Sequence, residues 1–416
     1  MLIKTSYEET VKILSLLQKV VSTKGLNESM KVVNLFIKDN KINIGAADGR
    51  LFCLTHLEGQ YDLEGESEDN SYFALNIKEI MNVLDKFKSL QRTKVKELEF
   101  YVQQEGVVLT VREVAKDENS PTAHLYNQDN KFLLRRENVL KIFQKEIPEM
   151  VVEEDSSVEA DSADLYKYTV YSYPLLTTPK DLMYLHFKKG SIYSIIGNHY
   201  GMLLENKLPE NFSDFSLTPY VVGFLREVMS TSDKFRFIRE DIWGPAADGS
   251  KQIVGIVLTI EVGNFIVKVK TANLTEKEIP KPFIPKPETY VEVDKFYLLD
   301  IIKRVSAYDT LYITAKIDES NSEIIVKTTQ SKQKIPVKKA EGKGEYQFAV
   351  TPSHLSNIIF SHMTKTIQGE PMDDLILGFR ECEDKKNVEL TCSDRTQEWL
   401  TKYPRAPKRE LSDTIF

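Results

Sequence analysis

Cysteine is scarce in this chain of 416 residues, which contains only Cys53, Cys382 and Cys392. Three thiols cannot form the paired framework that stabilises small secreted domains, so the disulfide-rich extracellular class is excluded. This cysteine content is typical of a reducing compartment. We therefore expect ordinary interior thiols and a cytoplasmic location.

Long apolar runs are missing as well. No apolar stretch approaches the ~20 residues that cross a bilayer, and the N-terminal residues MLIKTSYEETVKIL lack the basic-then-apolar order of a signal peptide. With 41% hydrophobic and 28% charged residues, the composition is that of a soluble globular protein. We therefore expect no membrane partner.

Positive charge is in deficit, and the formal net charge is −7. Because affinity for DNA depends on contacts between cations and phosphates, this value argues against tight DNA binding by the whole surface. The position of the charges matters more than their sum. Acidic residues cluster in 58–69 and 146–164, whereas many lysines lie on predicted helices. An acidic exterior with a mildly basic inner surface is consistent with this pattern.

Catalytic motifs are also missing. The sequence contains no G-x-x-x-x-G-K-[ST], G-x-G-x-x-G, H-E-x-x-H or G-x-S-x-G pattern, and its six histidines lack the spacing of metal ligands. The pair Asp373-Asp374 is typical of a turn before a strand, and a nuclease-like metal site on this pair is the enzymatic alternative. We predict no catalytic residue, no metal and no cofactor.

What the sequence does contain is one unit that occurs three times: a strand, a helix, a hairpin, a second helix and another hairpin. The second helices, each entered from a strand, lie in Tyr72–Phe87, Phe212–Val228 and Tyr346–Met363. Hairpin-like stretches precede them at Leu35–Leu57, Tyr184–Leu208 and Leu311–Val337, and strand pairs follow at Glu97–Val111, Lys234–Lys270 and Asp374–Thr391. Repetition on this scale indicates an architecture built from copies of one domain.

The repeats predict an α+β protein of three domains, each with two helices packed on antiparallel sheets. We place these domains at residues 1–116, 117–272 and 273–416. Residues 117–130 and the proline-rich 273–288 are expected linkers, 149–164 an acidic mobile loop, and 403–416 a C-terminal tail. A helix is expected at Glu8–Lys24, a hairpin turn at Asp39–Asn40, and an N-cap at Asp294 before helix Lys295–Tyr308.

The start of the second repeat has two interpretations. In the favoured one, Lys131–Leu134 is its first strand and Arg136–Ile147 its first helix. In the other, Tyr166–Tyr173 is the strand and a shortened helix lies around Leu175–Leu182, since Pro174 and Pro179 oppose a long helix. This repeat also carries an expected extra loop at Asp241–Lys251.

Polar and basic stripes recur on the predicted helices. Residues three and four apart share a helix face, and the stripes contain Lys12 and Lys19, Lys78 and Lys86, Lys303 and Arg304, and a small polar set, Ser353, Asn357 and Ser361. One such stripe is the ordinary solvated face of a helix. Because the stripes recur at equivalent places in repeated domains, they predict one common surface that faces DNA.

Two segments resemble a known family. Ile42–Leu51 (INIGAADGRL) is similar to its strand with a small-residue, Asp-Gly, basic, leucine turn, and Leu375–Glu398 is similar to its closing hairpin. Together with the three-unit architecture, these segments resemble the sliding clamps, the beta subunits of bacterial DNA polymerase III, in a divergent viral version.

The resemblance implies a non-enzymatic processivity factor. Such clamps are rings, here a head-to-tail homodimer, that encircle double-stranded DNA without sequence specificity, tether a DNA polymerase and are loaded by a clamp loader ATPase. Their partner pocket lies between the second and third domains. We place Tyr200 there, in a turn that departs from the family pattern, together with Leu411, Ile415 and Phe416, which resemble a clamp-binding peptide. The alternative is a β-rich scaffold or virion-assembly protein without a basic inner face.

Overall fold

The computed structural model describes residues 1–21, 31–63, 65, 71–145, 157–176, 184–188, 191–196, 199–203, 207–246, 250–271, 286–287, 289–305, 307, 310–318, 321–362, 366–367, 370–371, 373–394 and 397–406. Within these ranges, no helix is both long and apolar enough to span a bilayer.

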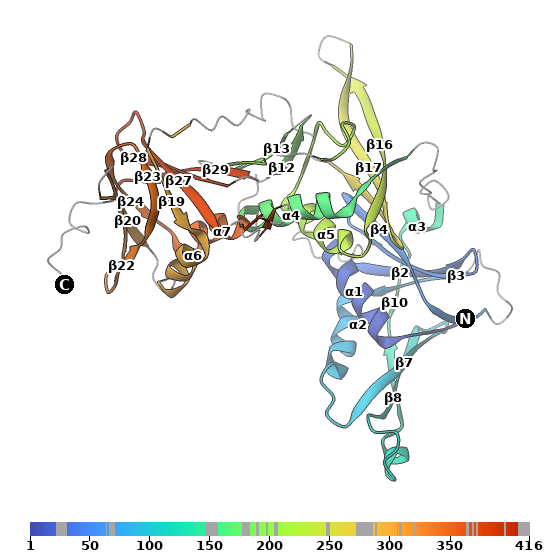
Figure 1. The fold of residues 1–416 in the computed structure, drawn as a ribbon. Helices are drawn as coiled ribbons and strands as arrows, with labels where there is room; N and C mark the ends of the chain where they lie inside the picture. The colour runs from blue at the N-terminus through green and yellow to red at the C-terminus, as the bar shows by residue number, and fades with distance from the viewer. Residues whose placement is uncertain are drawn as a thin grey trace. The chain divides into compact units, whose positions relative to one another are not determined.

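The helices and strands follow one order three times (Figure 1). The first series is β1 (Leu2–Thr5), α1 (Tyr7–Val21), β2 (Val32–Lys38), β3 (Lys41–Ala47), β4 (Leu51–Leu57), β5 (Gly59–Asp62), β6 (Tyr72–Asn76), α2 (Ile77–Leu84), η3 (Asp85–Phe87), β7 (Thr93–Val102), β8 (Val107–Ala115), η4 (Ala123–Tyr126) and β9 (Gln128–Leu134). A connecting segment then contains β10 (Arg136–Glu137) and α3 (Lys141–Lys145).

The second and third series repeat this order. The second is β11 (Val158–Asp161), α4 (Ser162–Leu176), β12 (Tyr184–Lys188), β13 (Ser191–Ile196), β14 (His199–Leu203), β15 (Phe215–Leu217), α5 (Pro219–Met229), β16 (Lys234–Pro245), β17 (Lys251–Val262) and β18 (Phe265–Lys270). The third is β19 (Thr289–Asp294), α6 (Lys295–Arg304), β20 (Leu311–Ile317), β21 (Glu323–Lys327), β22 (Lys332–Ile335), β23 (Val337–Glu341), β24 (Gly344–Val350), α7 (Pro352–Ser361), β25 (Thr366–Ile367), β26 (Glu370–Pro371), β27 (Asp374–Glu381), β28 (Asn387–Ser393) and β29 (Gln397–Pro404).

Local sequence signals set several of these boundaries as expected. Asp39 and Asn40 have φ angles of 52° and 56° and close the β2–β3 hairpin, because these residue types tolerate the left-handed conformation that a two-residue hairpin turn requires. The Asp294 carboxylate accepts a 2.8 Å hydrogen bond from the Tyr297 amide and caps α6. Both predictions are confirmed.

All strand pairs among the described residues are antiparallel, and the largest sheets continue from one series into the next. One nine-stranded sheet has the order β10-β6-β2-β3-β4-β18-β17-β16-β11, and the other has the order β15-β12-β13-β14-β29-β28-β27-β19-β23. Two smaller sheets have the orders β5-β1-β7-β8-β9 and β22-β21-β20-β24, and a two-stranded ribbon joins β25 and β26. The series are therefore joined edge to edge by backbone hydrogen bonds.

The chain divides into two compact units, residues 1–163 with 227–271 and residues 164–226 with 272–416. The division passes through the second series because β18 pairs with β4 of the first series and β14 pairs with β29 of the third. Whether the series act as three domains with bounds at 116 and 272 stays a prediction.

The helices of a series pack beside one another and bury one face. Helix α1 lies beside α2 and against β3 and β4, and α6 lies beside α7 (Figure 1). The buried face of α1 is apolar except for Thr10 and consists of Ile13, Leu14, Leu16, Leu17, Val20 and Val21. Burial of such a stripe contributes more to helix stability than intrinsic propensity does.

The favoured start of the second repeat is wrong. Lys131–Leu134 does form a strand, but it lies in β9 and pairs with β8, and within the expected helix Arg136–Ile147 only Lys141–Lys145 is helical. The alternative strand Tyr166–Tyr173 is wrong too, because these residues lie in α4. Helix α4 continues through Pro174, although a proline in its last turn removes the hydrogen bond that this position would donate to the carbonyl four residues earlier.

Other expected loops are partly ordered. Of the acidic loop 149–164, residues 158–161 form β11 and 162–164 begin α4, and the predicted linker 117–130 contains η4 and the start of β9. The expected loop Asp241–Lys251 is mostly strand, because β16 extends to Pro245. Tyr403 and Pro404 lie in β29 and not in a tail. Most of the linker 273–288 lies outside the described residues.

Candidate nucleic-acid interface

The two predicted lysines of α1 lie on its exposed side. Lys12 and Lys19 occupy the side opposite the buried stripe that faces β3 and β4. The Lys19 ammonium lies 3.1 Å from the Glu227 carboxylate, so part of its charge is compensated. An exposed ion pair of this kind is weak and screened by salt. Lys12 is therefore the stronger candidate for contact with an external anion.

Helix α2 and the short helix η3 continue this pattern. Ile77, Ile80, Met81 and Leu84 are buried, whereas Lys78 and Lys86 are exposed. The Asn76 side chain accepts hydrogen bonds from the amides of Lys78 and Glu79, at 3.0 and 3.3 Å, and fixes where the helix begins. The cap and the buried stripe together hold both lysines on the exposed side of the helix.

Lys303 and Arg304 form the last turn of α6, and both are exposed. Cations at this position are favourable for the helix itself, since they oppose the partial negative charge of its C-terminus. All six predicted basic residues are thus exposed on helices. Their contact with DNA stays a prediction.

The predicted polar stripe on α7 is wrong at one position. Ser361 is buried, and its hydroxyl donates a 2.6 Å hydrogen bond to the Ile358 carbonyl. The adjacent Phe360 is 52% exposed instead. Ser361 is buried because it lies three residues after the buried Ile358 and therefore on the same face of the helix. The next residue, His362, forms a buried 2.7 Å hydrogen bond between its Nδ1 and Asp394 Oδ2.

The predicted partner residues are only partly described. Tyr200 lies in β14, where its backbone is opposite Ile195 of β13 and Leu400 of β29. Leu411, Ile415 and Phe416 lie outside the described residues. The pocket that would unite them stays a prediction.

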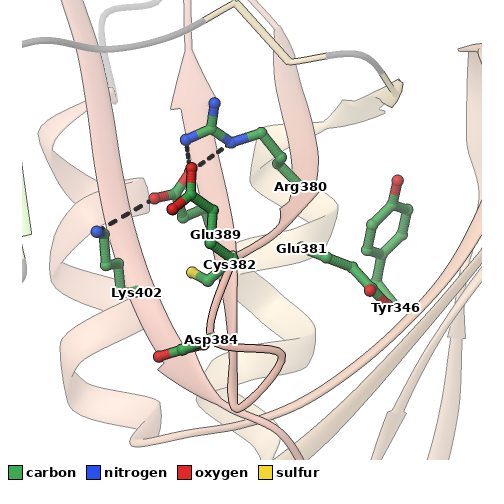
Figure 2. Close-up of a pocket in the computed structure, with 8 residues that line it drawn as sticks. Tyr346, Arg380, Glu381, Cys382, Asp384, Glu389 and Lys402 are labelled. Atoms are coloured by element: carbon green, nitrogen blue, oxygen red, sulfur yellow. Dashed lines mark hydrogen bonds and ion pairs between the residues drawn. The ribbon is translucent and has the colours of Figure 1, made fainter.

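A polar pocket of about 700 Å³ lies at the β27–β28 hairpin and was not anticipated from the sequence (Figure 2). Its centre is the Glu389 carboxylate, whose side chain is only 6% exposed. Arg380 Nε and Nη2 lie 2.7 and 2.6 Å from Glu389 Oε2, and Lys402 Nζ lies 3.3 Å from Oε1. Burial of a carboxylate is tolerated when cations compensate it in this way.

The pocket is lined mainly by charged side chains, with one thiol among them. Burial raises the pKa of the Cys382 thiol, and the nearby Glu389 carboxylate acts in the same direction, so the thiol stays protonated. Tyr346, Glu381 and Asp384, which Figure 2 labels, also line the pocket, as does Glu383. No single local motif encodes the pocket, because its residues come from several strands and the turn between two of them.

Cys392 and the pair Asp373-Asp374 have ordinary roles in packing and in backbone contacts. Cys392 lies opposite Leu377 of β27 and is not a cross-strand neighbour of Cys382. Asp374 forms an ion pair with Lys338, and the Asp373 carbonyl accepts a hydrogen bond from the Lys295 amide. Among the described residues, no three His, Cys, Asp or Glu side chains are grouped so that they could hold a metal ion.

The sequence matches no protein-family model and no curated protein. Solved structures are similar over almost the full length. The putative DNA polymerase III beta subunit of Eubacterium rectale shares 13% identity, covers 97% of this chain and 99% of its own, and gives a TM-score of 0.65. The DNA polymerase III beta subunit of Thermotoga maritima shares 11% identity, with coverages of 98% and 100% and a TM-score of 0.66.

The DNA polymerase sliding clamp of Bacillus subtilis is similar to the same extent. It shares 11% identity, covers 98% of this chain and 100% of its own, and gives a TM-score of 0.65. Such low identities together with nearly complete coverage mean that the architecture is shared whereas most side chains have changed. This chain therefore has the fold of the DNA polymerase III beta sliding clamps.

Proposed function

We propose that this protein is a DNA sliding clamp, a non-enzymatic ring that encircles duplex DNA in the cytoplasm and tethers a DNA polymerase. The observation that carries the proposal is the fold similarity, which covers 97–98% of this chain and 99–100% of the three clamp chains compared above. A fold alone does not define a function. The proposal therefore also rests on the exposed cations and on the strands that could close a ring.

The basic residues suit a protein that slides. Lys12, Lys78, Lys86, Lys303 and Arg304 are exposed on helices, in a chain whose net charge is −7. A ring held by topology needs only weak, non-specific phosphate contacts, since tight ones would slow its movement. The excess of acidic residues elsewhere would repel DNA from the outside of the ring.

The internal junctions suggest how a ring would close. In each junction, a strand that precedes the second helix of one series pairs with the last strand of the next series. β4 of the first series pairs with β18 of the second, and β14 of the second pairs with β29 of the third. A third junction of this kind would join β22 of the third series to β9 of the first. Both are end strands of their sheets in the part of the chain that the structure describes. Pairing them between two copies gives a head-to-tail homodimer.

The two edges differ in the side chains that they expose. Leu133 on β9 is 65% exposed, and the nearby Leu125 is 62% exposed, so this edge offers apolar area for burial. β22 presents the exposed Lys332 and Lys334, the second of which is ion-paired with Glu323. β9 presents the exposed Lys131 and Asp129, the second of which is ion-paired with Arg112. These charges are thus partly compensated within the chain, and buried apolar side chains would supply most of the affinity.

We further propose that a clamp loader ATPase opens the ring and that the polymerase binds between the second and third series. Leu411, Ile415 and Phe416 would lie in or beside that pocket, near Tyr200. Such a pocket gains most of its affinity from a few apolar anchors. Deletion of residues 411–416 would then change polymerase or loader binding and leave the melting temperature nearly unchanged, whereas a large thermal loss with binding intact would assign the tail to the core.

The test is retention on closed DNA. We expect a solution mass of twice 47.8 kDa, and protein assembled on a nicked plasmid should survive a wash at high salt and be released when the plasmid is linearised. Linearisation is the matched control, because it removes the topological link and leaves the DNA surface unchanged. Equal retention on linear and circular DNA, or a salt-labile complex on both, would refute a sliding clamp.

A further inference from the structure

Residues 136–143 form a strap on the first unit. The strap contains β10, whose residues Arg136 and Glu137 pair with Leu75 and Ala74 of β6, and the first residues of α3. It follows β9 and ends within α3, a short helix of five residues. A helix of this length is not stable alone, so contacts with the sheet hold the strap in place.

One side chain anchors the strap. Phe143 is fully buried, with its ring centroid 4.9 Å from that of Phe52 in a stacked arrangement and 6.3 Å from that of Phe36. The floor of its pocket is Gly45, where a Cβ atom would lie only 2.4 Å from the Phe143 ring. A glycine is therefore required here for the aromatic ring to enter, and Ala47 and Leu54 complete the pocket.

Hydrogen bonds also hold the strap to the sheet. The Asn34 carboxamide, which is fully buried, accepts a 3.0 Å hydrogen bond from the Leu140 amide. The Arg136 guanidinium donates a 3.0 Å hydrogen bond to the Tyr72 carbonyl. Folded domains bind extended peptides through similar contacts. These are a strand added at a sheet edge, a buried side-chain amide that binds the peptide backbone, and an aromatic anchor.

Within the strap, only this anchor is fully buried. Val139, Leu140 and Ile142 are partly buried around it, and Lys141 is exposed. The order Leu140-Lys141-Ile142-Phe143 places an Ile-Phe pair two residues after a leucine. The same residue types recur at the C-terminus as Leu411 and Ile415-Phe416, with a longer spacing between leucine and isoleucine.

We propose that the groove formed by Asn34, Phe36, Gly45, Phe52 and the β6 edge is a peptide-binding site that the strap occupies in cis. When the strap detaches, the groove accepts a segment of a protein partner with the pattern Leu-x-Ile-Phe. The strap therefore acts as a competitor that sets the affinity for the partner, since a binding-competent state that is rarely populated lowers the apparent affinity by that fraction. The site lies on the first unit and does not depend on DNA retention.

The test uses the full chain and a fluorescent peptide of residues 138–145, NVLKIFQK. In the variant chain, residues 138–145 are replaced by a Gly/Ser segment of equal length. We measure dissociation constants by fluorescence anisotropy. We expect this variant to bind the native peptide at least tenfold more tightly than it binds the same peptide with Phe143→Ala. The wild-type chain should bind the peptide at least tenfold more weakly than the variant, because its strap fills the groove.

Several results would overturn the proposal. They are equal affinity for the two peptides, equal affinity of the two chains, or no binding by a variant whose circular dichroism shows that it is folded. If the variant does not fold, hydrogen exchange of the wild type decides. We expect the Leu140 and Phe143 amides to exchange by local opening, faster than those of β2 and β3. Exchange of the strap only together with global unfolding would show that it is a fixed part of the core.

Discussion

Leu133→Asp is the most direct perturbation of the proposed ring. Leu133 lies on β9, opposite Val108 of β8, and its side chain is 65% exposed in a single chain. The substitution therefore removes little core packing, and the stability of the monomer should stay nearly unchanged. In a dimer closed by β9 and β22, however, this leucine would be buried and the aspartate would bring an unpaired charge into the interface.

The expected magnitude follows from the exposed fraction. Full burial of a leucine side chain contributes about 1.5–3 kcal/mol, so the part of Leu133 that is still exposed corresponds to about 1–2 kcal/mol per junction. A head-to-tail dimer has two junctions, which gives about 2–4 kcal/mol in total. Since ~1.4 kcal/mol is a factor of ten, the dimer dissociation constant should rise roughly 30-fold to 700-fold. Desolvation of the aspartate adds to this loss.

Analytical ultracentrifugation over a concentration series measures this change. Trp243→Asp is the matched control, because Trp243 is 59% exposed, on the β16–β17 hairpin and away from the proposed junction. We expect Trp243→Asp to dimerise like the wild type and Leu133→Asp to be monomeric at the same concentration. An unchanged dissociation constant for Leu133→Asp, or an equal loss in both variants, would refute the β9–β22 junction.

Three further predictions concern the DNA surface, a helix cap and pH. Lys12→Ala with Lys19→Ala should reduce the salt slope of retention on circular DNA by about one unit for each phosphate that is no longer neutralised, and unchanged retention across a salt series would contradict this. Asp294→Ala should cost about 1 kcal/mol in urea unfolding because the α6 cap is removed, whereas Asp294→Asn should retain most of it. Burial lowers the pKa of His186 to about 4, with a contribution from the Lys188 charge. The unfolded chain therefore binds a proton at this histidine more readily than the folded chain does. The neutral histidine contributes up to ~3 kcal/mol to the free energy of unfolding, in full above about pH 6.5, and this contribution should be lost as the pH falls toward 4. A wild-type pH profile no steeper than that of His186→Gln would contradict this role.

Sequence alone was sufficient where the signal is local. The turn at Asp39–Asn40 and the cap at Asp294 depend on residue types and a few neighbouring dihedral angles, so both were predicted with their positions. The apolar stripe of α1 likewise predicted which side is buried and that Lys12 and Lys19 are exposed. Because such local signals occur in the same order three times along the chain, they were enough to indicate the repeated architecture.

The tertiary structure decided what depends on partners distant in the sequence. Arg136–Ile147 was expected to form one helix, yet in the structure Arg136 and Glu137 pair with β6, helix α3 is limited to Lys141–Lys145, and Phe143 packs over Gly45. Pro174 opposes a helix locally, yet α4 continues through it. The junctions β4–β18 and β14–β29 and the compensated Glu389 join residues that no local pattern connects. Pairing of strand edges and burial of charge are properties of the folded chain, and for this reason the tertiary structure alone determined them.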